Sequence, residues 1–527
     1  MRQGILNVSI TDELGHGTQT GKLGLMVFLE LMVVSGLFES ADRRLGLRSN
    51  SGQGWSDGRM LASLMLLQLA GGQGLADLDV LNGETALGEL LDAAELGSMN
   101  RSERRRWKRR FRGGRTRIVP SVTAAQKYLE RLHPLDVEAQ RAAALAAGRK
   151  AFIPATNAAL RGLCGVNDDF VAFVQQQAPQ TTATLDMDAT LVQTTKQEAL
   201  FCYQKFRAFQ PFNVYWAEQN IVVQSEFRDG NVPAGFEQLR VLQETLAKLP
   251  KGVERVRVRS DTAGYQADLL RYCAQGKSER FGRIDFTISV KVSQAFREAV
   301  LAVPDEDWNP LPKRGRAFRK GASQEWAEVC FVPNSLATQK NGPCYRFIAV
   351  RDPLEQLALP MDTLPDEQLE LPGLTDDLPF PVIDFGQGHQ FKVGGIVTNL
   401  GAPGHELIRW HRKRCGDSEA IHAIMKNDLG GGRMPSGKFG INAGWWGIMV
   451  LTLNLLHFMK DHILGGKWAK MRMKALRFGF INVAARLIKT ARTMLLRASR
   501  NHPGTALILQ ARRTLLAMAQ GPPALAI

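Results

Sequence analysis

The 527-residue sequence lacks any cysteine spacing that binds zinc and any apolar run long enough to cross a bilayer. Its six cysteines are scattered without a Cys-x-x-Cys pair, which indicates a reducing compartment. The longest apolar runs, Leu23–Phe38 and Trp445–Met459, fall short of the ~20 residues of a membrane span and contain polar residues. No signal-peptide core follows the first residues. We therefore expect a cytoplasmic protein with two buried apolar helices and no membrane partner.

Acidic residues are too few to balance the basic ones. The 51 Asp and Glu against 67 Lys and Arg give a net charge of +16, although the charged fraction of 22% is ordinary and excludes a wholly disordered chain. The excess lies in two segments. Arg101–Arg117 has ten basic residues and one acidic residue, Lys460–Arg513 has thirteen and one, and the remainder carries −5. Two basic segments around a mildly acidic middle indicate a polyanionic partner such as nucleic acid.

The first basic segment interleaves Trp107 and Phe111 with arginines, a pattern suited to phosphate contact combined with base stacking. A solvated linker is the alternative interpretation. The candidates for phosphate contact are Arg104, Arg105, Arg106, Lys108, Arg109 and Arg110.

Apolar periodicity predicts helices up to about residue 180 and strands beyond it. The predicted order from there is strand, hairpin pair, helix, strand, helix and strand: 184–190, 212–217, 221–227, 236–246, 253–261, 265–273 and 284–292. That is the order of a ribonuclease H-like core. A proline-rich stretch interrupts it, and the core resumes with a strand over Phe391–Leu400 and a helix over Ser418–Asp428, with Ser418 as its N-cap.

The expected fold class is therefore α/β, with a ribonuclease H-like core that an insertion module interrupts, and with helical N-terminal and basic helical C-terminal regions. The predicted divisions are a helical N-terminal DNA-binding region (1–120, basic arm 101–117), a helical linker (121–180), the first part of the core (181–292), the insertion module (293–388), the last strand and helices of the core (389–459) and a basic C-terminal helical region (460–527).

Three acidic residues fall where such a core brings side chains together: Asp188 on the first strand, Asp261 at the end of the fourth strand and Glu419 on the last helix. Carboxylates so placed can hold two Mg²⁺ or Mn²⁺ ions for phosphoryl transfer on DNA. Each acid also has a simpler interpretation. An isolated Asp at a strand end often caps a turn, and Glu419 near a helix start favours the helix dipole.

Several stretches resemble DDE transposases of bacterial insertion sequences, closest to the thirteen-eighty insertion-sequence family, within the group that shares a Tyr-x-x-Arg-x-x-x-Glu-x(6)-Lys signature. Glu419 and Lys426 keep the Glu-x(6)-Lys spacing. The stretches that carry the resemblance are Leu185–Thr190, Arg228–Gly235, Arg259–Tyr265 and Pro435–Trp445.

The resemblance implies that Asp188, Asp261 and Glu419 are the catalytic metal ligands, with Asp186 as the competing candidate for the first position. It also implies that Lys426 contacts a DNA phosphate near the cut. A further set of positions departs from the signature. Arg414 would be the signature arginine but lies five residues before Glu419, with the extra residue near Gly416, and Trp410 or His411 takes the tyrosine position.

The activity implied by the resemblance is metal-dependent strand cleavage and strand transfer on double-stranded DNA. The partners would be the terminal inverted repeats and target DNA, held by a homodimer at the bacterial nucleoid. An alternative is a phosphatase of the haloacid dehalogenase type, because Asp186-Met-Asp188-Ala-Thr190 fits its Asp-x-Asp-x-Thr opening, with Asp186 as nucleophile and Asp188 as general acid. The downstream metal motif of that group is missing. A DNA-binding protein whose carboxylates have decayed is the non-enzymatic alternative.

Overall fold

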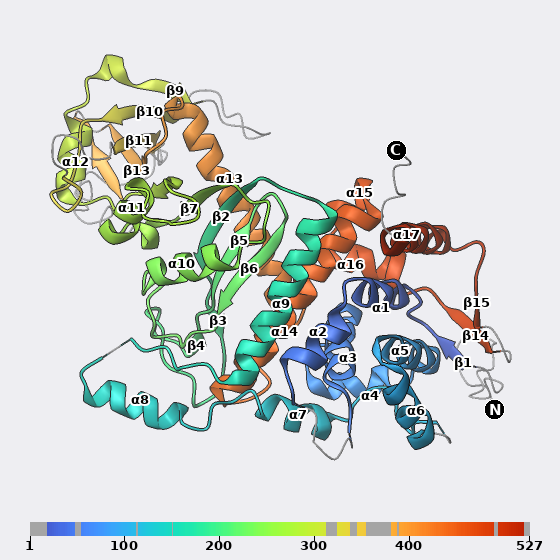
Figure 1. Cartoon of the computed structure of the whole chain (residues 1–527). Helices are drawn as coiled ribbons and strands as arrows, with labels where there is room; N and C mark the ends of the chain where they lie inside the picture. Colours follow the sequence, from blue (N-terminus) through green and yellow to red (C-terminus); the bar gives the residue numbers. More distant parts are fainter. Residues whose placement is uncertain are drawn as a thin grey trace, which may run out of the picture.

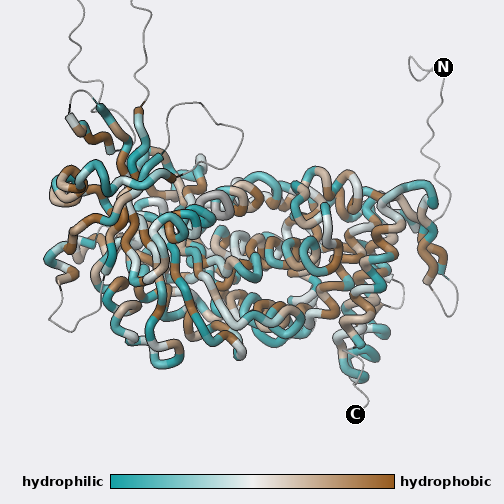
Figure 2. The backbone as a smooth tube through the Cα atoms, turned by 90° about the horizontal axis from the view of Figure 1, so that it is seen from above, coloured by the Kyte–Doolittle hydropathy of each residue, from teal (hydrophilic) through white to brown (hydrophobic). Residues whose placement is uncertain are grey.

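The computed structural model describes residues 18–47, 54–111, 114–149, 151–311, 324–337, 345–354, 381–386, 389–489 and 494–520, without the side chains of 415–418. A large sheet and its helices form one end of the molecule, and a bundle of helices forms the other (Figure 1). Seen from above, the two parts make one elongated body, with apolar segments running through both (Figure 2).

The centre of the large sheet has the strand order β6-β5-β2-β7-β8. Strands β2, β7 and β8 are parallel to one another, while β5 and β6 form an antiparallel hairpin beside β2. The strands and helices of this part follow one another along the chain as predicted: β2 (Thr182–Ala189), β5 (Phe212–Trp216), β6 (Ile221–Glu226), α10 (Gln238–Lys248), β7 (Arg255–Ser260), α11 (Ala267–Ala274) and β8 (Asp285–Ser289).

Strand β2 is central and buried on both faces. Its residues from Ala183 to Met187 are all buried, including Asp186, which is 1% exposed. A parallel strand covered on both sides is expected to exclude water from both sets of side chains. Another simple interpretation of the sequence, in which Asp186 and Asp188 form the solvated face of an edge strand, is therefore wrong.

The described strands of the predicted insertion module extend the same sheet. From β8 the order continues β13-β11-β10-β9, all antiparallel, and β12 pairs with β13. These elements are α12 (Gln294–Leu301), β9 (Asn309–Leu311), β10 (Gln324–Val329), β11 (Arg346–Pro353), β12 (Val382–Asp384) and β13 (Gln390–Thr398). Of the predicted module, 312–323, 338–344, 355–380 and 387–388 lie outside the described residues.

Helix α13 (Gly404–Ala423) begins earlier than predicted and continues into a π-helical turn, η4 (Ile424–Asp428). Ser418 and Gly416 are inside this helix, so the prediction of Ser418 as an N-cap is wrong. The first turns are stabilised by tertiary packing, because Leu407 and Ile408 pack with Ile348 and Ile396 of the sheet extension. Helix α13 thus connects the extension of the sheet to its centre.

The helical part is organised around α14 (Phe439–Phe458), which is apolar on all sides and almost completely buried. Together with its π-helical continuation η5 (Met459–Leu464), it is long and apolar enough to cross a membrane, but 94% of the apolar stretch is buried within the protein, as expected for a core helix. It contacts α3, α9 and β6. The other helices in this part are α1 (Gly24–Val34), α2 (Leu37–Arg44), α3 (Asp57–Ala70), α4 (Leu78–Leu81), α5 (Thr85–Ser98), α6 (Arg101–Arg110), α7 (Val122–Glu130), α8 (Val137–Ala146) and α9 (Ala158–Gln177).

Two polar residues of α14 bind the backbone of the β5–β6 hairpin. Asn454 donates to the carbonyl of Val222 and accepts from its amide, both at 2.8 Å. The ring Nδ1 of His457 lies 2.7 Å from the carbonyl of Asn220. Because buried backbone groups need partners, these residues explain how an apolar core helix tolerates Asn and His.

His457 is expected to make folding acid-sensitive. Burial lowers its pKa from 6.5 to about 4. Between these two pH values the imidazole is protonated in the unfolded chain but neutral in the folded chain. Stability is then complete above pH 6.5 and falls as the pH drops, by about 3 kcal/mol at pH 4. We expect denaturant unfolding to show a shallower decline between pH 7 and 4 for His457→Gln than for the native chain; equal declines would contradict this role.

The predicted helical C-terminal region contains two strands, so that prediction is wrong in part. Strands β14 (Ala485–Lys489) and β15 (Met494–Ala498) form a three-stranded sheet with β1 (Thr18–Thr20). Because β1 comes from the opposite end of the chain, no local signal marks the pairing. The helices of this region are α15 (Gly466–Ala469), α16 (Met473–Leu476) and α17 (Pro503–Gln520), and α17 packs on α1.

Candidate active site

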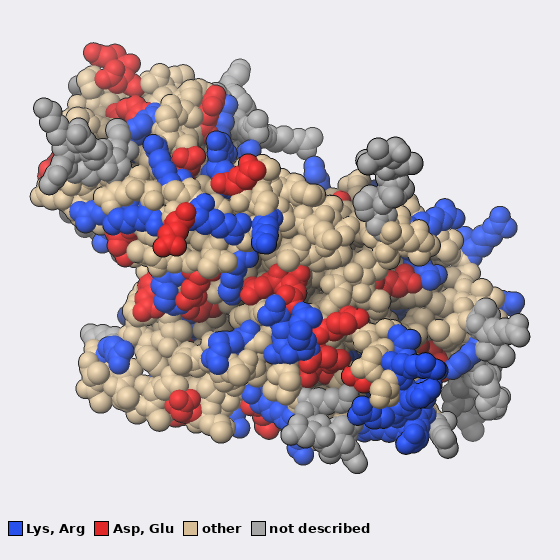
Figure 3. All heavy atoms as spheres, in the orientation of Figure 1, with Lys and Arg blue, Asp and Glu red and all other residues tan. Residues whose placement is uncertain are grey.

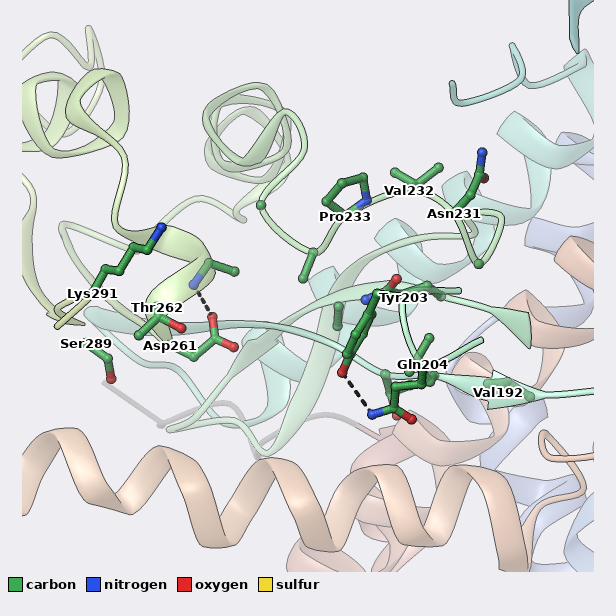
Figure 4. Close-up of a pocket in the computed structure, with 18 of the residues that line it drawn as sticks. Val192, Tyr203, Gln204, Asn231, Val232, Pro233, Asp261, Thr262, Ser289 and Lys291 are labelled. Carbon is green, nitrogen blue, oxygen red and sulfur yellow. Dashed lines mark hydrogen bonds between the residues drawn. The ribbon is translucent and has the colours of Figure 1, made fainter. Parts of the chain in front are cut away.

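The carboxyl ends of β2, β7 and β8 open onto a cavity of about 1430 Å³. Its wall includes the residues that follow each strand, among them Thr190, Asp261 and Lys291 (Figure 4). The wall also includes Lys392 of β13 and Lys426 of η4. Ligands of open α/β sheets commonly bind outside the carboxyl ends of the strands, so this edge is the candidate active site.

Asp188 and Asp261 lie side by side at this edge. Asp188 is the penultimate residue of β2, and Asp261 directly follows β7, its parallel neighbour, in a register that pairs Met187 with Ser260. Burial raises the pKa of Asp188 to about 6; the charge of Arg414 lowers it and that of Asp261 raises it. Asp261 also accepts a hydrogen bond of 3.0 Å from the amide of Ala263, so it caps the turn η2 (Thr262–Gly264) as well.

Arg414 of α13 reaches the carboxylate of Asp188. Its Nη1 lies 3.4 Å from Oδ2 of Asp188, and its side chain is 8% exposed. The spacing irregularity in the signature therefore does not move this arginine away from the first aspartate.

Asp186 has a different environment. Its two oxygens accept hydrogen bonds of 2.6 and 2.7 Å from Nε and Nη2 of Arg259, and its side chain is fully buried. The remaining Nη1 of Arg259 donates to the carbonyl of Trp410 at 2.7 Å. Asp186 thus anchors α13 through Arg259 and does not line the cavity. Asp188, rather than Asp186, is the neighbour of Asp261.

His411 anchors α13 to β8. Its Nδ1 lies 3.0 Å from Oγ1 of Thr287, and its Nε2 lies 3.0 Å from Oγ of Ser289, which faces the cavity. Burial, followed by the charges of Arg414 and Arg259, lowers its pKa to about 3, so the ring is neutral. The two residues at the signature tyrosine position, Trp410 and His411, therefore hold the helix that carries Arg414.

Glu419 is not grouped with the two aspartates. It is exposed on α13, and five residues of an α-helix turn it by about 140° from the direction of Arg414. Within the described part of the chain, no group of three or more His, Cys, Asp or Glu side chains is arranged to hold a metal. The structure brings together Asp188, Asp261 and Arg414, and it places Lys426 on the cavity wall.

Several lining residues were missed in the sequence, among them Tyr203, Gln204, Ser289, Lys291 and Lys392. Lys291 and Ser289 could have been identified, because they end a predicted apolar strand next to the predicted edge. Tyr203 and Gln204 lie in an irregular loop, between the short strands β3 (Val192–Gln193) and β4 (Ala208–Phe209), which has no recognisable pattern.

The first basic segment is a docked helix rather than a solvated linker. Asn100 caps α6 by accepting from the amides of Ser102 and Glu103. Arg115 stacks on Trp107 and Phe111 at 5.3 and 4.3 Å from the ring centroids, so these rings are engaged within the protein. All the Lys and Arg side chains of α6 are exposed, and they form a dense basic surface (Figure 3).

Comparisons with known proteins give the family of the chain. The sequence profile of the family described as Transposase DDE domain group 1 matches residues 7–349 and 385–520. No curated protein sequence matches closely enough to count as a relative. A solved cryo-EM structure of a piggyBac transposase synaptic complex with hairpin DNA aligns with a TM-score of 0.39 and 10% identity, over 96% of this chain and 83% of that chain. Because the family profile covers most of the chain, the protein belongs to the transposase DDE domain group 1 family.

Proposed function

We propose that this protein is the transposase of a bacterial insertion sequence of the thirteen-eighty type. It cleaves DNA strands at the terminal inverted repeats and joins the freed 3′ ends to target DNA. The observation that carries the proposal is that Asp261 lies on the wall of a large cavity with Asp188 beside it on the neighbouring strand, in a chain that belongs to a DDE transposase family. The strand order β6-β5-β2-β7-β8 supports a ribonuclease H-like core.

The pair of aspartates fits Mg²⁺ or Mn²⁺. Mg²⁺ in proteins is often held by one or two carboxylates, completed by water and substrate phosphates. Asp188 has a raised pKa because it is buried and faces the charge of Asp261. A cation bound between the two carboxylates would offset both the cost of burying the charge of Asp188 and its repulsion by Asp261. Two divalent ions, when bound, would supply charge neutralisation at the scissile phosphate. Arg414 would orient Asp188, and Lys426 and Lys291, which line the cavity, would contact the phosphates of the strand.

Glu419 remains the proposed third ligand. It is one residue out of phase with Arg414 for an α-helix, and a π-bulge, whose hydrogen bonds join residues five apart, lengthens one helical turn. The chain already adopts a π-helical turn at η4, directly after α13. A π-bulge between Arg414 and Glu419 would therefore bring the carboxylate toward the two aspartates.

The experiment that tests the proposal uses the full chain and duplex DNA made from the sequence that flanks its reading frame, in the presence of Mg²⁺. We expect strand cuts at matching inverted repeats and joining of 3′ ends to a second duplex. Hydrolysis of a small phosphoester without any strand cut would overturn the proposal in favour of a phosphatase. No observation favours the phosphatase, because its nucleophile would be Asp186, which Arg259 holds in the interior.

Helix α6 is proposed to bind the phosphates of double-stranded DNA, in an assembly with two copies of the chain. We expect the triple variant Arg105→Ala, Lys108→Ala, Arg109→Ala to bind duplex DNA more weakly. Its plot of log affinity against log salt concentration should be shallower by about one for each phosphate that the variant no longer neutralises. Fluorescence anisotropy between about 50 and about 300 mM salt measures this slope.

A matched control removes the same charge from another surface. Lys251, Arg255 and Lys277 are exposed near the amino ends of β7 and β8, opposite the cavity edge. Their triple replacement by alanine should leave the salt slope unchanged. Equal slopes for the two triple variants would show that α6 makes no specific contribution.

A further inference from the structure

The cavity has a second end whose chemistry differs from that of the carboxylates. Asp261, Thr262, Ser289 and Lys291 lie at one end, while Tyr203, Gln204, Asn231 and Val192 lie at the other (Figure 4). This far end is lined by an aromatic ring, amides and small apolar groups. These groups suit a flat heteroaromatic ligand with polar edges rather than a metal or a phosphate.

Tyr203 provides a flat surface at this end. Its side chain is 74% exposed although it lies against the cavity, and its hydroxyl accepts a hydrogen bond of 3.1 Å from Nε2 of Gln204. Val232 and Pro233 line the wall close by. Exposed aromatic rings beside a groove are the stacking platforms on which proteins hold unpaired bases.

Amide groups surround this platform. Gln210 lines the cavity, is 5% exposed, and its Oε1 has no hydrogen-bond partner among the described residues. A buried polar atom without a partner costs about 1–3 kcal/mol, which a suitable ligand would recover. Carboxamides offer one donor and one acceptor side by side, and this arrangement matches the edge of a nucleobase.

The wall that carries these amides is rigid. The amide of Gln210 donates to the carbonyl of Arg228, at the start of the Arg228–Gly235 motif. Gly230 in that motif lies so close to the β4 backbone that a Cβ would be 2.4 Å from the carbonyl oxygen of Ala208. Asp229 is held by two nitrogens of Arg141, at 2.8 and 3.2 Å. A site held in this way is preorganised for its ligand.

Basic side chains also line the cavity, and Lys291 lies at the end that contains Asp261 (Figure 4). Lys392 and Lys426 belong to the wall of the same cavity. At about 1430 Å³, the cavity is larger than the ~300–1,000 Å³ of typical small-molecule sites, so it can hold a nucleotide together with its neighbouring phosphates.

We propose that the far end of this cavity binds an unpaired nucleotide of the DNA strand, with its base stacked on Tyr203 and its edge facing Gln204, Gln210 and Asn231. The three lysines contact the adjoining phosphates. This inference rests on the proposed function, since the strand must enter past Asp261.

The test compares two labelled duplexes of the same sequence, one blunt and one with a three-nucleotide single-stranded overhang that contains 2-aminopurine. Binding is measured with the full chain by fluorescence anisotropy without divalent ions, so that cleavage does not contribute. A stacked base is worth about 1–3 kcal/mol, so we expect the overhang duplex to bind about tenfold more tightly. Tyr203→Ala should abolish that preference and restore 2-aminopurine emission, whereas Tyr203→Phe should retain both effects.

Phe201 offers a matched control, because it is an exposed aromatic residue of the same loop (56% exposed) that does not line the cavity. Phe201→Ala should keep the preference for the overhang. An unchanged preference in Tyr203→Ala, or an equal loss in Phe201→Ala, would overturn the inference. Absence of strand cleavage in the native chain, with the Tyr203-dependent preference intact, would overturn the proposed catalysis and leave this nucleotide site standing.

Discussion

Asp261→Ala is expected to lower the rate of DNA strand cleavage by at least about a thousandfold while DNA binding persists. Asp261 is the one acidic side chain on the described cavity wall, and it lies next to Asp188 at the ends of two parallel strands. A divalent ion stabilises the charge of the transition state by several kcal/mol, and loss of a ligand for it removes most of that effect. Single-turnover cleavage of end-labelled duplex measures the rate, and anisotropy measures binding.

The control for this variant is Asp268→Asn, an exposed aspartate in the first turn of α11, seven residues further along the chain. It should cleave DNA at the native rate. Asp188→Asn should resemble Asp261→Ala, because both carboxylates belong to the same pair. Native cleavage rates in either active-site variant would exclude the assignment. Loss of both cleavage and DNA binding would instead indicate a misfolded chain, which circular dichroism would reveal.

The second large effect concerns stability rather than catalysis. Asp186→Ala and Arg259→Ala should each lower the free energy of unfolding by about 3–5 kcal/mol, because each leaves an unpaired charge in the interior. The double variant Asp186→Leu, Arg259→Met should recover much of that loss, since an apolar pair of similar volume carries no desolvation penalty. Denaturant unfolding of the four proteins measures the two losses and the recovery.

The Asp186 variants also separate the two candidates for the first carboxylate. If Asp186 were a catalytic ligand or a nucleophile, its replacement would abolish the reaction with little loss of stability. The geometry predicts instead that replacement of Asp186 causes the larger loss of stability and that replacement of Asp188 causes the larger loss of cleavage. A stable but inactive Asp186→Asn variant would contradict this assignment.

Much of the large sheet could be predicted because its signals are local. Alternating hydropathy and turn residues identified β2, β5, β6, β7 and β8 in their order along the chain. Parallel pairing then places the carboxyl ends of β2 and β7 at one edge. The adjacency of Asp188 and Asp261 followed from this pairing, because each aspartate was predicted near the end of its strand.

Helix α13 shows where such reasoning fails. Ser418 suggested a helix start, because serine is a common N-cap residue. Packing of Leu407 and Ile408 against the sheet extension outweighs that local preference and starts the helix at Gly404. The phase of Glu419 relative to Arg414 depends on this longer helix, so the sequence could not reveal it.

The amino-acid sequence by itself determined the order of strands, the two basic segments and the two aspartates at neighbouring strand ends, because hydropathy period, charge and turn residues act over a few positions. Tertiary structure alone decided that Asp186 pairs with Arg259, that β1 pairs with β14, and that Tyr203 lies across the cavity from Asp261. Those contacts join residues that are far apart in the chain, and their free energy arises only when burial excludes water from both partners.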